Sequence, residues 1–282
     1  MYTLIVENEK GKKLQLSQNR NYTITQIEGL NPVKASINTS VVGLTDGEVF
    51  NSSRAECRNI VITAYIEGAI EKNRQTLYTY FTPKKWVKLY FENENRDVYI
   101  EGYVESFDVD LFVARENVQI SILCPKPYFK NVDMITSEFS SIAGGFQFTL
   151  ELPEDGIPFS IYEQEVRKTI YYEGGENTGL TIRFTALGTV KNPVIYNADT
   201  KGFFRVLFTM VAGDVITIET SQGEKSVTLL RDGKESNIIG CIDKGVEWFE
   251  LSTGDNVFTS GAEEGYQLLQ IRIQNNVLYG GV

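Results

Sequence analysis

The residues with the most direct capacity for chemistry are closely spaced carboxylates. The pairs are Asp108/Asp110, Glu163/Glu165, Glu92/Glu94 and Glu263/Glu264. On a strand, residues two apart share a face. Paired acids on one face can hydrolyse a glycosidic bond or bind calcium through oxygen atoms. A solvated strand face produces the same pattern, and the full calcium-binding loop of an EF-hand is missing. We therefore favour solvated faces.

The sequence contains no histidine, which excludes the Ser-His-Asp and Cys-His modes of nucleophile activation and imidazole metal ligands. Cys57, Cys124 and Cys241 are far apart, odd in number and form no Cys-x-x-Cys pair. Neither a disulfide framework nor a zinc site is expected, and the thiols are interpreted as buried or idle. The sequence predicts no catalytic residue, no metal site and no cofactor, and hence no enzyme.

Aromatic residues offer a second kind of chemistry, because an aromatic face with a polar tip can stack on a sugar ring. The candidates for contact with a glycan are Trp248, Tyr171 and Tyr172, drawn from a wider group that includes Tyr162 and Phe249. Packing in a core or at a sheet edge explains the same residues without any ligand.

Charge and hydropathy exclude two classes of partner. The net charge is −10, and the densest basic group is only Lys10, Lys12 and Lys13. Tight binding of nucleic acid is not expected, because affinity for a phosphate backbone comes mainly from lysine and arginine. No apolar run approaches the roughly 20 residues of a membrane span. Charges follow a very short apolar stretch at the first residues, unlike a secretory signal. We expect synthesis and folding in a cytoplasm.

Most segments alternate apolar and polar residues with a period of two. Leu180 to Ala186, Leu269 to Ile273 and Val118 to Cys124 each place apolar residues at every second position. This pattern predicts antiparallel strands with one buried face, as in β-sandwiches and barrels. The phase changes near Glu105 and Ser106, which predicts a bulge.

Two segments depart from the strand pattern. From Ala69 to Phe81 the apolar residues fall at helical offsets, and Pro83 ends the run, so we expect one helix. Asn31 to Ala55 is polar and long, which predicts either a protruding loop or a hairpin; segments of this length often serve function. It could wrap a neighbouring copy or be a mobile surface loop.

A domain boundary is predicted after Cys124-Pro125-Lys126-Pro127-Tyr128-Phe129, because two prolines within three residues end a strand. Polar sequence follows. We place an N-terminal domain at residues 1–130 and a C-terminal domain at residues 131–282.

Several segments follow one another in a specific order. They are the strand Arg58 to Thr63, the helix with Glu71 and Arg74, the stop at Tyr80 to Pro83, the strand Trp86 to Phe91, the strand Arg96 to Val104, and Val118 to Phe129 with its Cys-Pro-Lys-Pro-Tyr-Phe end. This order resembles the N-terminal domain of siphophage distal tail proteins. Trp248 to Leu251, Thr253 to Asn256 and Tyr279 to Val282 are similar to the ending of that family. Met134 to Tyr172 matches no part of it.

The resemblance implies a fold and a role. The fold is mainly β: an N-terminal split barrel or β-sandwich with one helix, and an outward C-terminal β-sandwich like galectins and carbohydrate-binding modules. The N-terminal domains would form a hexameric ring in the tail baseplate of a phage, a prophage remnant or a tailocin. The ring would join the tail tube protein to the tail-tip protein and the receptor-binding apparatus of the virion.

Two further hypotheses stay open. In the first, the C-terminal domain is a carbohydrate-binding module that recognises glycan on the host surface. In the second, a carboxylate pair makes the protein a glycan hydrolase.

Overall fold

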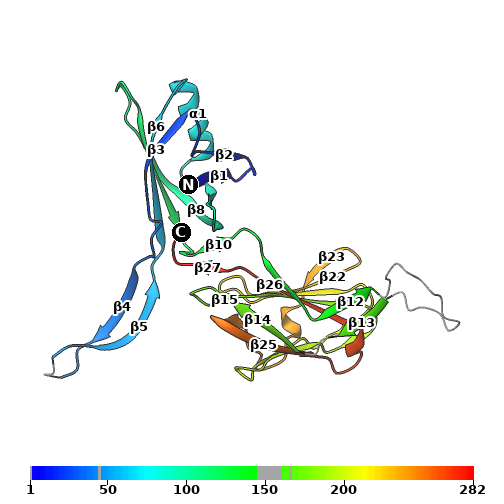
Figure 1. The fold of residues 1–282 in the computed structure, drawn as a ribbon. Helices are drawn as coiled ribbons and strands as arrows, with labels where there is room; N and C mark the ends of the chain where they lie inside the picture. The colour runs from blue at the N-terminus through cyan, green and yellow to red at the C-terminus, as the bar shows by residue number, and fades with distance from the viewer. Residues whose placement is uncertain (1, 44–45, 145–159, 165–166) are drawn as a thin grey trace. The chain divides into compact units, whose positions relative to one another are not determined.

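The computed structural model describes residues 2–43, 46–144, 160–164 and 167–282, and it leaves the side chains of residues 140–144 and 160–164 undescribed. The chain divides into two compact units (Figure 1). Unit 1 contains Met1–Val132 and Leu278–Val282, and unit 2 contains Asp133–Val277. The chain passes from unit 1 to unit 2 after Val132, two residues beyond the predicted boundary. The return of Leu278–Val282 to unit 1 differs from the prediction, which assigned these residues to the second domain.

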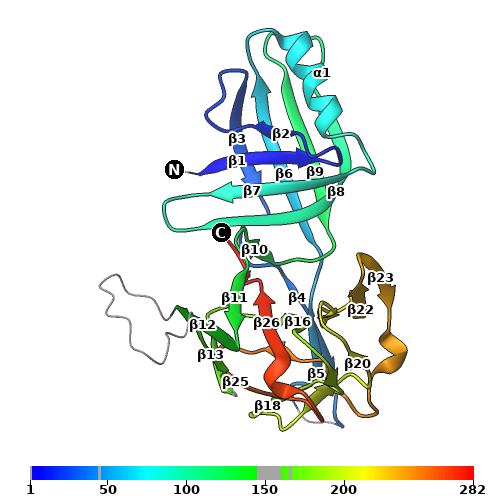
Figure 2. The ribbon, with the colours of Figure 1, turned by 90° about the vertical axis from the view of Figure 1, so that its right-hand side faces the viewer.

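Unit 1 is built on a nine-stranded sheet whose main path has the order β2-β1-β7-β8-β9-β6-β3. Short β10 and β27 pair with each other, and β10 also pairs with β8. The strands are β1 (Thr3–Asn8), β2 (Lys13–Gln15), β3 (Tyr22–Glu28), β6 (Arg58–Ile66), β7 (Trp86–Glu92), β8 (Asp97–Val109), β9 (Asn117–Cys124), β10 (Phe129–Asn131) and β27 (Leu278–Tyr279). Figure 2 shows how strongly this sheet curves.

Alternation along the strands creates the core of unit 1. In β6, Ile60, Ile62 and Ile66 are at most 1% exposed, and their neighbours face outward. The predicted bulge is confirmed, since the register of β8 against β9 shifts between Val104 and Ser106. The bulge reverses the phase of β8 and lets Phe107 pack against the same core.

The predicted helix is confirmed as α1 (Ile70–Tyr80). It packs against β1 and β6 and buries Leu77, and the following Phe81 is also fully buried. Arg74 anchors it to the end of the β8–β9 hairpin through an ion pair with Glu116. No helix among the described residues is long and apolar enough to cross a membrane.

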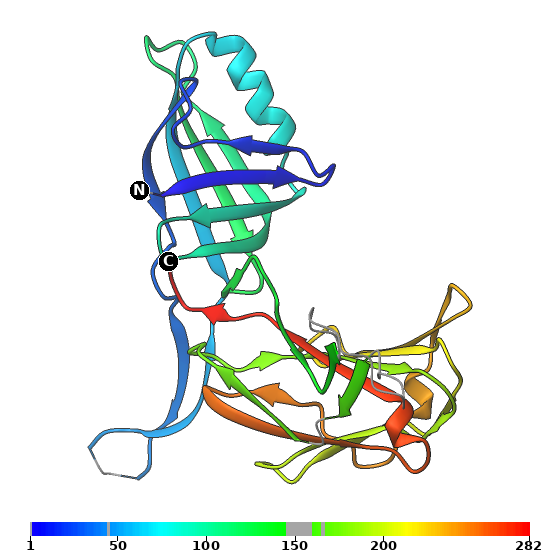
Figure 3. The same ribbon diagram turned by 45° about the vertical axis from the view of Figure 1, so that its right-hand side comes forward.

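The segment between β3 and β6 forms a hairpin, one of the two predicted alternatives. Its strands are β4 (Ala35–Ser40) and β5 (Val49–Ala55), which pair with each other as a separate two-stranded sheet. We call this hairpin the arm. Figures 1 and 3 show the arm running out beyond the nine-stranded sheet.

The side chain of Arg58 ties together the segments where the chain enters and leaves unit 1. It is 1% exposed. Nε donates to the Pro127 carbonyl (2.7 Å), Nη1 donates to the carbonyls of Gly29 and Asn31 (2.8 Å for Asn31), and Nη2 donates to Gly280 (2.6 Å). The guanidinium also lies 4.5 Å from the centre of the Phe129 ring.

No carboxylate in the described part of the chain forms an ion pair with Arg58. Backbone carbonyls therefore take the place of a counter-ion. Burial lowers the pKa of Arg58, but arginine stays protonated in proteins. We call this set of contacts the Arg58 clamp.

Unit 2 contains a six-stranded sheet, β11-β26-β16-β21-β22-β23, and a four-stranded sheet, β14-β25-β18-β19. The six strands are β11 (Ile135–Glu138), β26 (Leu269–Asn275), β16 (Thr181–Ala186), β21 (Val215–Glu219), β22 (Ser226–Arg231) and β23 (Lys234–Asn237). The four are β14 (Arg167–Tyr172), β25 (Gly254–Gly261), β18 (Val194–Asn197) and β19 (Phe203–Arg205).

Shorter elements complete unit 2. They are β12 (Ser140–Gly144) with β13 (Ser160–Gln164), β15 (Thr178–Gly179) with β24 (Glu250–Leu251), β17 (Val190–Lys191) with β20 (Thr209–Met210), and the 3-10 turns η1 (Ile239–Cys241) and η2 (Tyr266–Leu268). The alternation predicted for residues 180–186 and 269–273 is confirmed. Ile182 and Phe184 from one sheet and Phe204 and Phe258 from the other are all 0% exposed. The fold is mainly β with a galectin-like second domain, as predicted.

Replacing Arg58 by methionine should destabilise unit 1 by on the order of 3 kcal/mol, because the change leaves buried carbonyls without donors. The two tryptophans, Trp86 and Trp248, lie in different units. In a Trp248→Phe background, urea unfolding followed by fluorescence then reports unit 1 alone. We expect the midpoint of Arg58→Met to fall by about 1 M or more. Exposed Arg20→Met is the control, and equal midpoints for the two variants would contradict the clamp.

Asp214 should make unit 2 sensitive to acid. Its carboxylate is 2% exposed and accepts from Arg231 and from the Val211 N–H (2.8 Å), and these hydrogen bonds, chiefly that of Arg231, lower its pKa. The folded pKa lies below the unfolded value, so the stabilisation is full above about pH 4 and is lost as pH falls through the folded pKa. In a Trp86→Phe background, Asp214→Asn should be less stable than the parent at pH 7, with the gap closing in acid. Asp232→Asn, at an exposed position, is the control. A stability difference between Asp214→Asn and its parent that does not change with pH would contradict this role of Asp214.

Candidate functional site

The arm exposes an unusual amount of apolar surface. Five of its large apolar side chains are each at least 54% exposed: Ile37, Val41, Val42, Val49 and Phe50. The sequence predicted a polar segment, because its apolar residues are few: Ile37 and the two short pairs Val41–Val42 and Val49–Phe50 stand among serine, asparagine and threonine. An isolated two-stranded hairpin is only marginally stable in water, and its outer edges offer unpaired backbone groups. The arm therefore has the properties of a segment that is completed by a partner.

The base of the arm borders a hollow of about 460 Å³. Its lining includes Lys34, Glu56 and Cys57 together with Gly29 and Arg58. A Cβ on Gly29 would lie 2.0 Å from the Asn59 carbonyl oxygen, and its φ is +84°. Only glycine fits there, which fixes the path of the chain into the arm.

A second apolar projection lies at the turn between β8 and β9. Leu111 and Val113 are 44% and 50% exposed, and Phe112 is completely exposed with a φ of +65°. A bulky side chain in the left-handed region is strained, so the surrounding turn must impose this conformation.

Lysines from two distant segments meet at one edge of unit 1. Lys10 and Lys12, from the turn before β2, line a hollow of about 560 Å³ together with Lys85, Tyr80 and Trp86. Lys85 is held by Glu9 at 3.0 Å, and this contact lowers the pKa of Glu9. The sequence showed the group Lys10, Lys12 and Lys13, but no local pattern predicted that Lys85 lies beside it.

The structure separates the three predicted glycan-contact residues. Tyr172 is 0% exposed and donates its hydroxyl to the Glu176 carbonyl, so its ring has no accessible face. Tyr171 points outward from β14 and is 67% exposed. Trp248 is half-buried and packs edge-on against Phe204 of β19. β19 and β14, which carries the two tyrosines, are opposite edge strands of the four-stranded sheet. The three rings form no common platform; a glycan role for Tyr171 or Trp248 alone stays a prediction.

Among the described carboxylates, neither Asp108/Asp110 nor Glu263/Glu264 forms a reactive centre. Asp108 is exposed on β8 opposite Gln119, and Asp110 lies beyond the end of that strand. Within the described ranges no group of three or more cysteine, aspartate or glutamate side chains is placed to hold a metal ion. Glu165 lies outside the described residues. Glu263 and Glu264 both accept from Lys191, which explains that pair as an ion-pair cluster.

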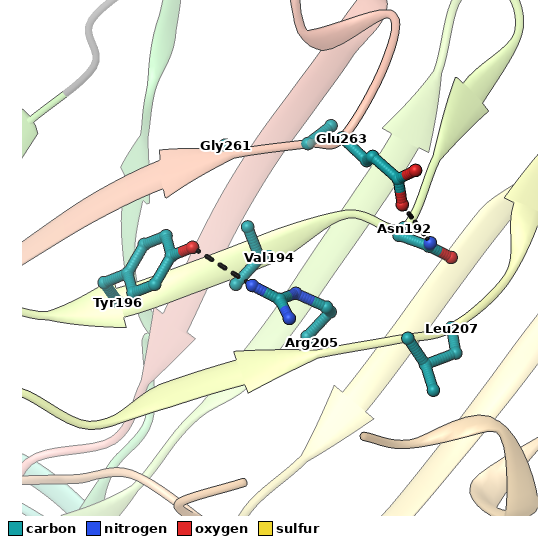
Figure 4. A pocket seen from close by; sticks show the side chains of 8 residues that line it. Asn192, Val194, Tyr196, Arg205, Leu207, Gly261 and Glu263 are labelled. Atoms are coloured by element: carbon teal, nitrogen blue, oxygen red, sulfur yellow. Dashed lines mark hydrogen bonds between the residues drawn. The ribbon is translucent and has the colours of Figure 1, made fainter. Parts of the chain in front are cut away.

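Unit 2 carries a hollow that the sequence did not predict. It has a volume of about 370 Å³ and lies between β18, β19 and the loop after β25 (Figure 4). Tyr196, Arg205 and Glu263 contribute its main functional groups. These residues are spread over 68 positions and carry no common motif, so only the pairing of the strands could bring them together.

Two protein families match separate parts of the chain. The family described as phage tail protein RIFT-related domain matches residues 9–124. The family described as siphovirus-type tail component, C-terminal domain, matches residues 173–272. No curated protein matches the chain.

Solved structures share the whole fold at low sequence identity. The Dit protein of phage SPP1, described as a paradigm of the hub adsorption apparatus in phages infecting Gram-positive bacteria, has a TM-score of 0.71 and 11% identity over 99% of each chain. A chain of the phage P2 baseplate in its activated conformation with Ca has a TM-score of 0.58 and 10% identity over 100% of each chain. A chain of the same baseplate with Sr has a TM-score of 0.57 and 11% identity, over 97% of this chain and 98% of that one.

The two family matches and the two-unit β fold define a structural component of a phage tail. The chain belongs to the siphophage distal tail protein family, as its segment order predicted.

The cysteines provide a test of the base of the arm. Cys57 is exposed there, whereas Cys124 is 0% exposed and burial raises its pKa to about 12. The thiolate is the nucleophile, so alkylation at pH 8 should label Cys57 rapidly and leave Cys124 unmodified. Timed mass spectrometry of peptides measures both rates, and labelling in urea supplies the control. Equal rates in the folded protein would contradict this description.

Proposed function

We propose that six copies of this chain form a closed ring that acts as the baseplate hub of the tail. The ring would join the tail tube protein to the tail-tip protein and to the receptor-binding apparatus of the virion. Membership in the distal tail protein family supports this role, as does the likeness to Dit of SPP1 and to chains of the P2 baseplate. The function is geometric, and no covalent chemistry is proposed.

The observation that carries the proposal is the arm. A ring needs one interface that is repeated head to tail until rotation closes it. The arm presents exposed apolar side chains and two strand edges, while the rest of unit 1 folds around its own core. The arm would lie on the neighbouring copy and bury there the surface that it exposes in the single chain.

This proposal is tested by the mass of the particle in solution. Native mass spectrometry of the wild type should give a species at six times the 31.8 kDa chain mass, with a ring in negative stain. Ile37→Ser combined with Phe50→Ser should shift the population to monomers, because burial of two large side chains stabilises each interface by roughly 3 kcal/mol or more.

The control is Leu230→Ser, which removes a similarly sized side chain that is 44% exposed on unit 2. It should leave the ring intact. Replacing residues 41–49 by an Asn-Gly turn should also give folded monomers with unchanged circular dichroism. A wild type that stays monomeric at high concentration, with and without its tail-tip neighbour, would contradict the ring. Rings of unaltered stability in the arm variants would exclude the arm from the interface.

A further inference from the structure

The hollow of unit 2 lies on the outward face of the four-stranded sheet. Along β18 the side chains alternate, with Ile195 at 0% exposure facing the core and Tyr196 at 37% facing outward. Arg205 of β19 is directly opposite Val194, on the same face. Figure 4 shows Tyr196, Arg205 and Glu263 around one space, from three separate segments.

The floor of the hollow exists because residue 261 is glycine. Gly261 pairs with Val194 across the strands. A Cβ at this position would sit 3.4 Å from Val194 Cγ1 and 4.0 Å from Tyr196 Cε2, which is ordinary contact distance. Its backbone is outside the left-handed region, so the conformation does not require glycine. A side chain would fit the backbone and fill the hollow.

The polar walls are held in place before any ligand arrives. Arg205 donates to Asp243 at 3.0 Å and to the Tyr196 hydroxyl at 3.4 Å. Across the hollow, Glu263 accepts from Lys191 and from Asn192, both at 2.6 Å. Fixed side chains lose little conformational entropy on binding.

The charges of the lining residues are already compensated. Arg205 and Glu263 are the charged residues of the lining, and each has a partner of opposite sign, Asp243 and Lys191. A free anion or cation gains little from such groups. A neutral ligand with many hydroxyls gains most, because Arg205 can still donate and the Glu263 oxygens can still accept, and charge-assisted hydrogen bonds are the strong ones.

The apolar part of the lining completes the recognition. Tyr196 presents an exposed ring beside Val194 and Leu207. A pyranose has an apolar face of C–H groups and a rim of hydroxyls, which matches an aromatic face bordered by planar polar side chains. We propose that this hollow binds one neutral pyranose unit of a glycan, with Tyr196 stacking on the sugar and Arg205 and Glu263 holding its hydroxyls.

This site goes beyond the ring and is independent of it, since a ring can close without any ligand in unit 2. It also differs from the aromatic residues that the sequence suggested, because Tyr171 and Trp248 do not line the hollow.

The test uses the whole chain and a panel of methyl glycosides of glucose, galactose, N-acetylglucosamine and rhamnose as probes. Saturation-transfer difference NMR and titration measure binding. At least one glycoside should bind with a dissociation constant of about 1 mM, the range that a few contacts on an open site supply. Tyr196→Ala should weaken this binding at least tenfold, and Gly261→Val should abolish it by filling the floor.

Tyr103→Ala is the control, because Tyr103 is an exposed tyrosine of unit 1 that does not line the hollow. It should leave the affinity unchanged. Absence of binding by the wild type across the whole panel would overturn the proposal, as would loss of binding in Tyr103→Ala with retention in Tyr196→Ala. Native mass spectrometry of Tyr196→Ala should still show the oligomer of the wild type, so failure of the sugar site and failure of the ring can be told apart.

Discussion

The architecture of unit 1 depends on one buried cation, Arg58, whose hydrogen bonds are all accepted by backbone carbonyls. Arg58 joins the end of β3, the Pro127 segment and the Gly280 segment, which are neighbours in space but up to 251 positions apart in the chain. A buried charge is stable only when its hydrogen-bonding groups are satisfied. The clamp therefore fixes three chain paths at once, including the start of the arm.

The alternation of apolar residues was sufficient to predict the long strands β9, β16 and β26, because burial on one face of a sheet leaves a signal with a period of two. A change of phase in this signal predicted the bulge near Glu105, and apolar residues at helical offsets predicted α1. The pairing of β10 with β27 was not predicted, since strands of two or three residues have no measurable period. Nothing local identifies Leu278–Val282 as part of unit 1; contacts with distant residues do so, among them the pairing of Tyr279 with Phe129 and the hydrogen bond from Arg58 to Gly280.

Functional surfaces were harder to predict than the fold. The absence of histidine argued against several kinds of catalysis. The aromatic candidates for glycan contact do not form one surface, because Tyr172 belongs to the core. Neighbours in sequence on a strand point to opposite faces, so Tyr171 and Tyr172 could never have formed one platform. The hollow around Tyr196 depends on the strand pairing of Gly261 with Val194, which is a property of the sheet and leaves no trace in any single segment.

The return of residues 278–282 to unit 1 has a consequence for the order of events on the ribosome. In the sequence, unit 2 lies between the two segments of unit 1. Gly280 is therefore translated after the six-stranded and four-stranded sheets of unit 2. Until then Arg58 lacks one of its four acceptors. A nascent chain that stops before Gly280 therefore keeps an incomplete clamp at the base of the arm.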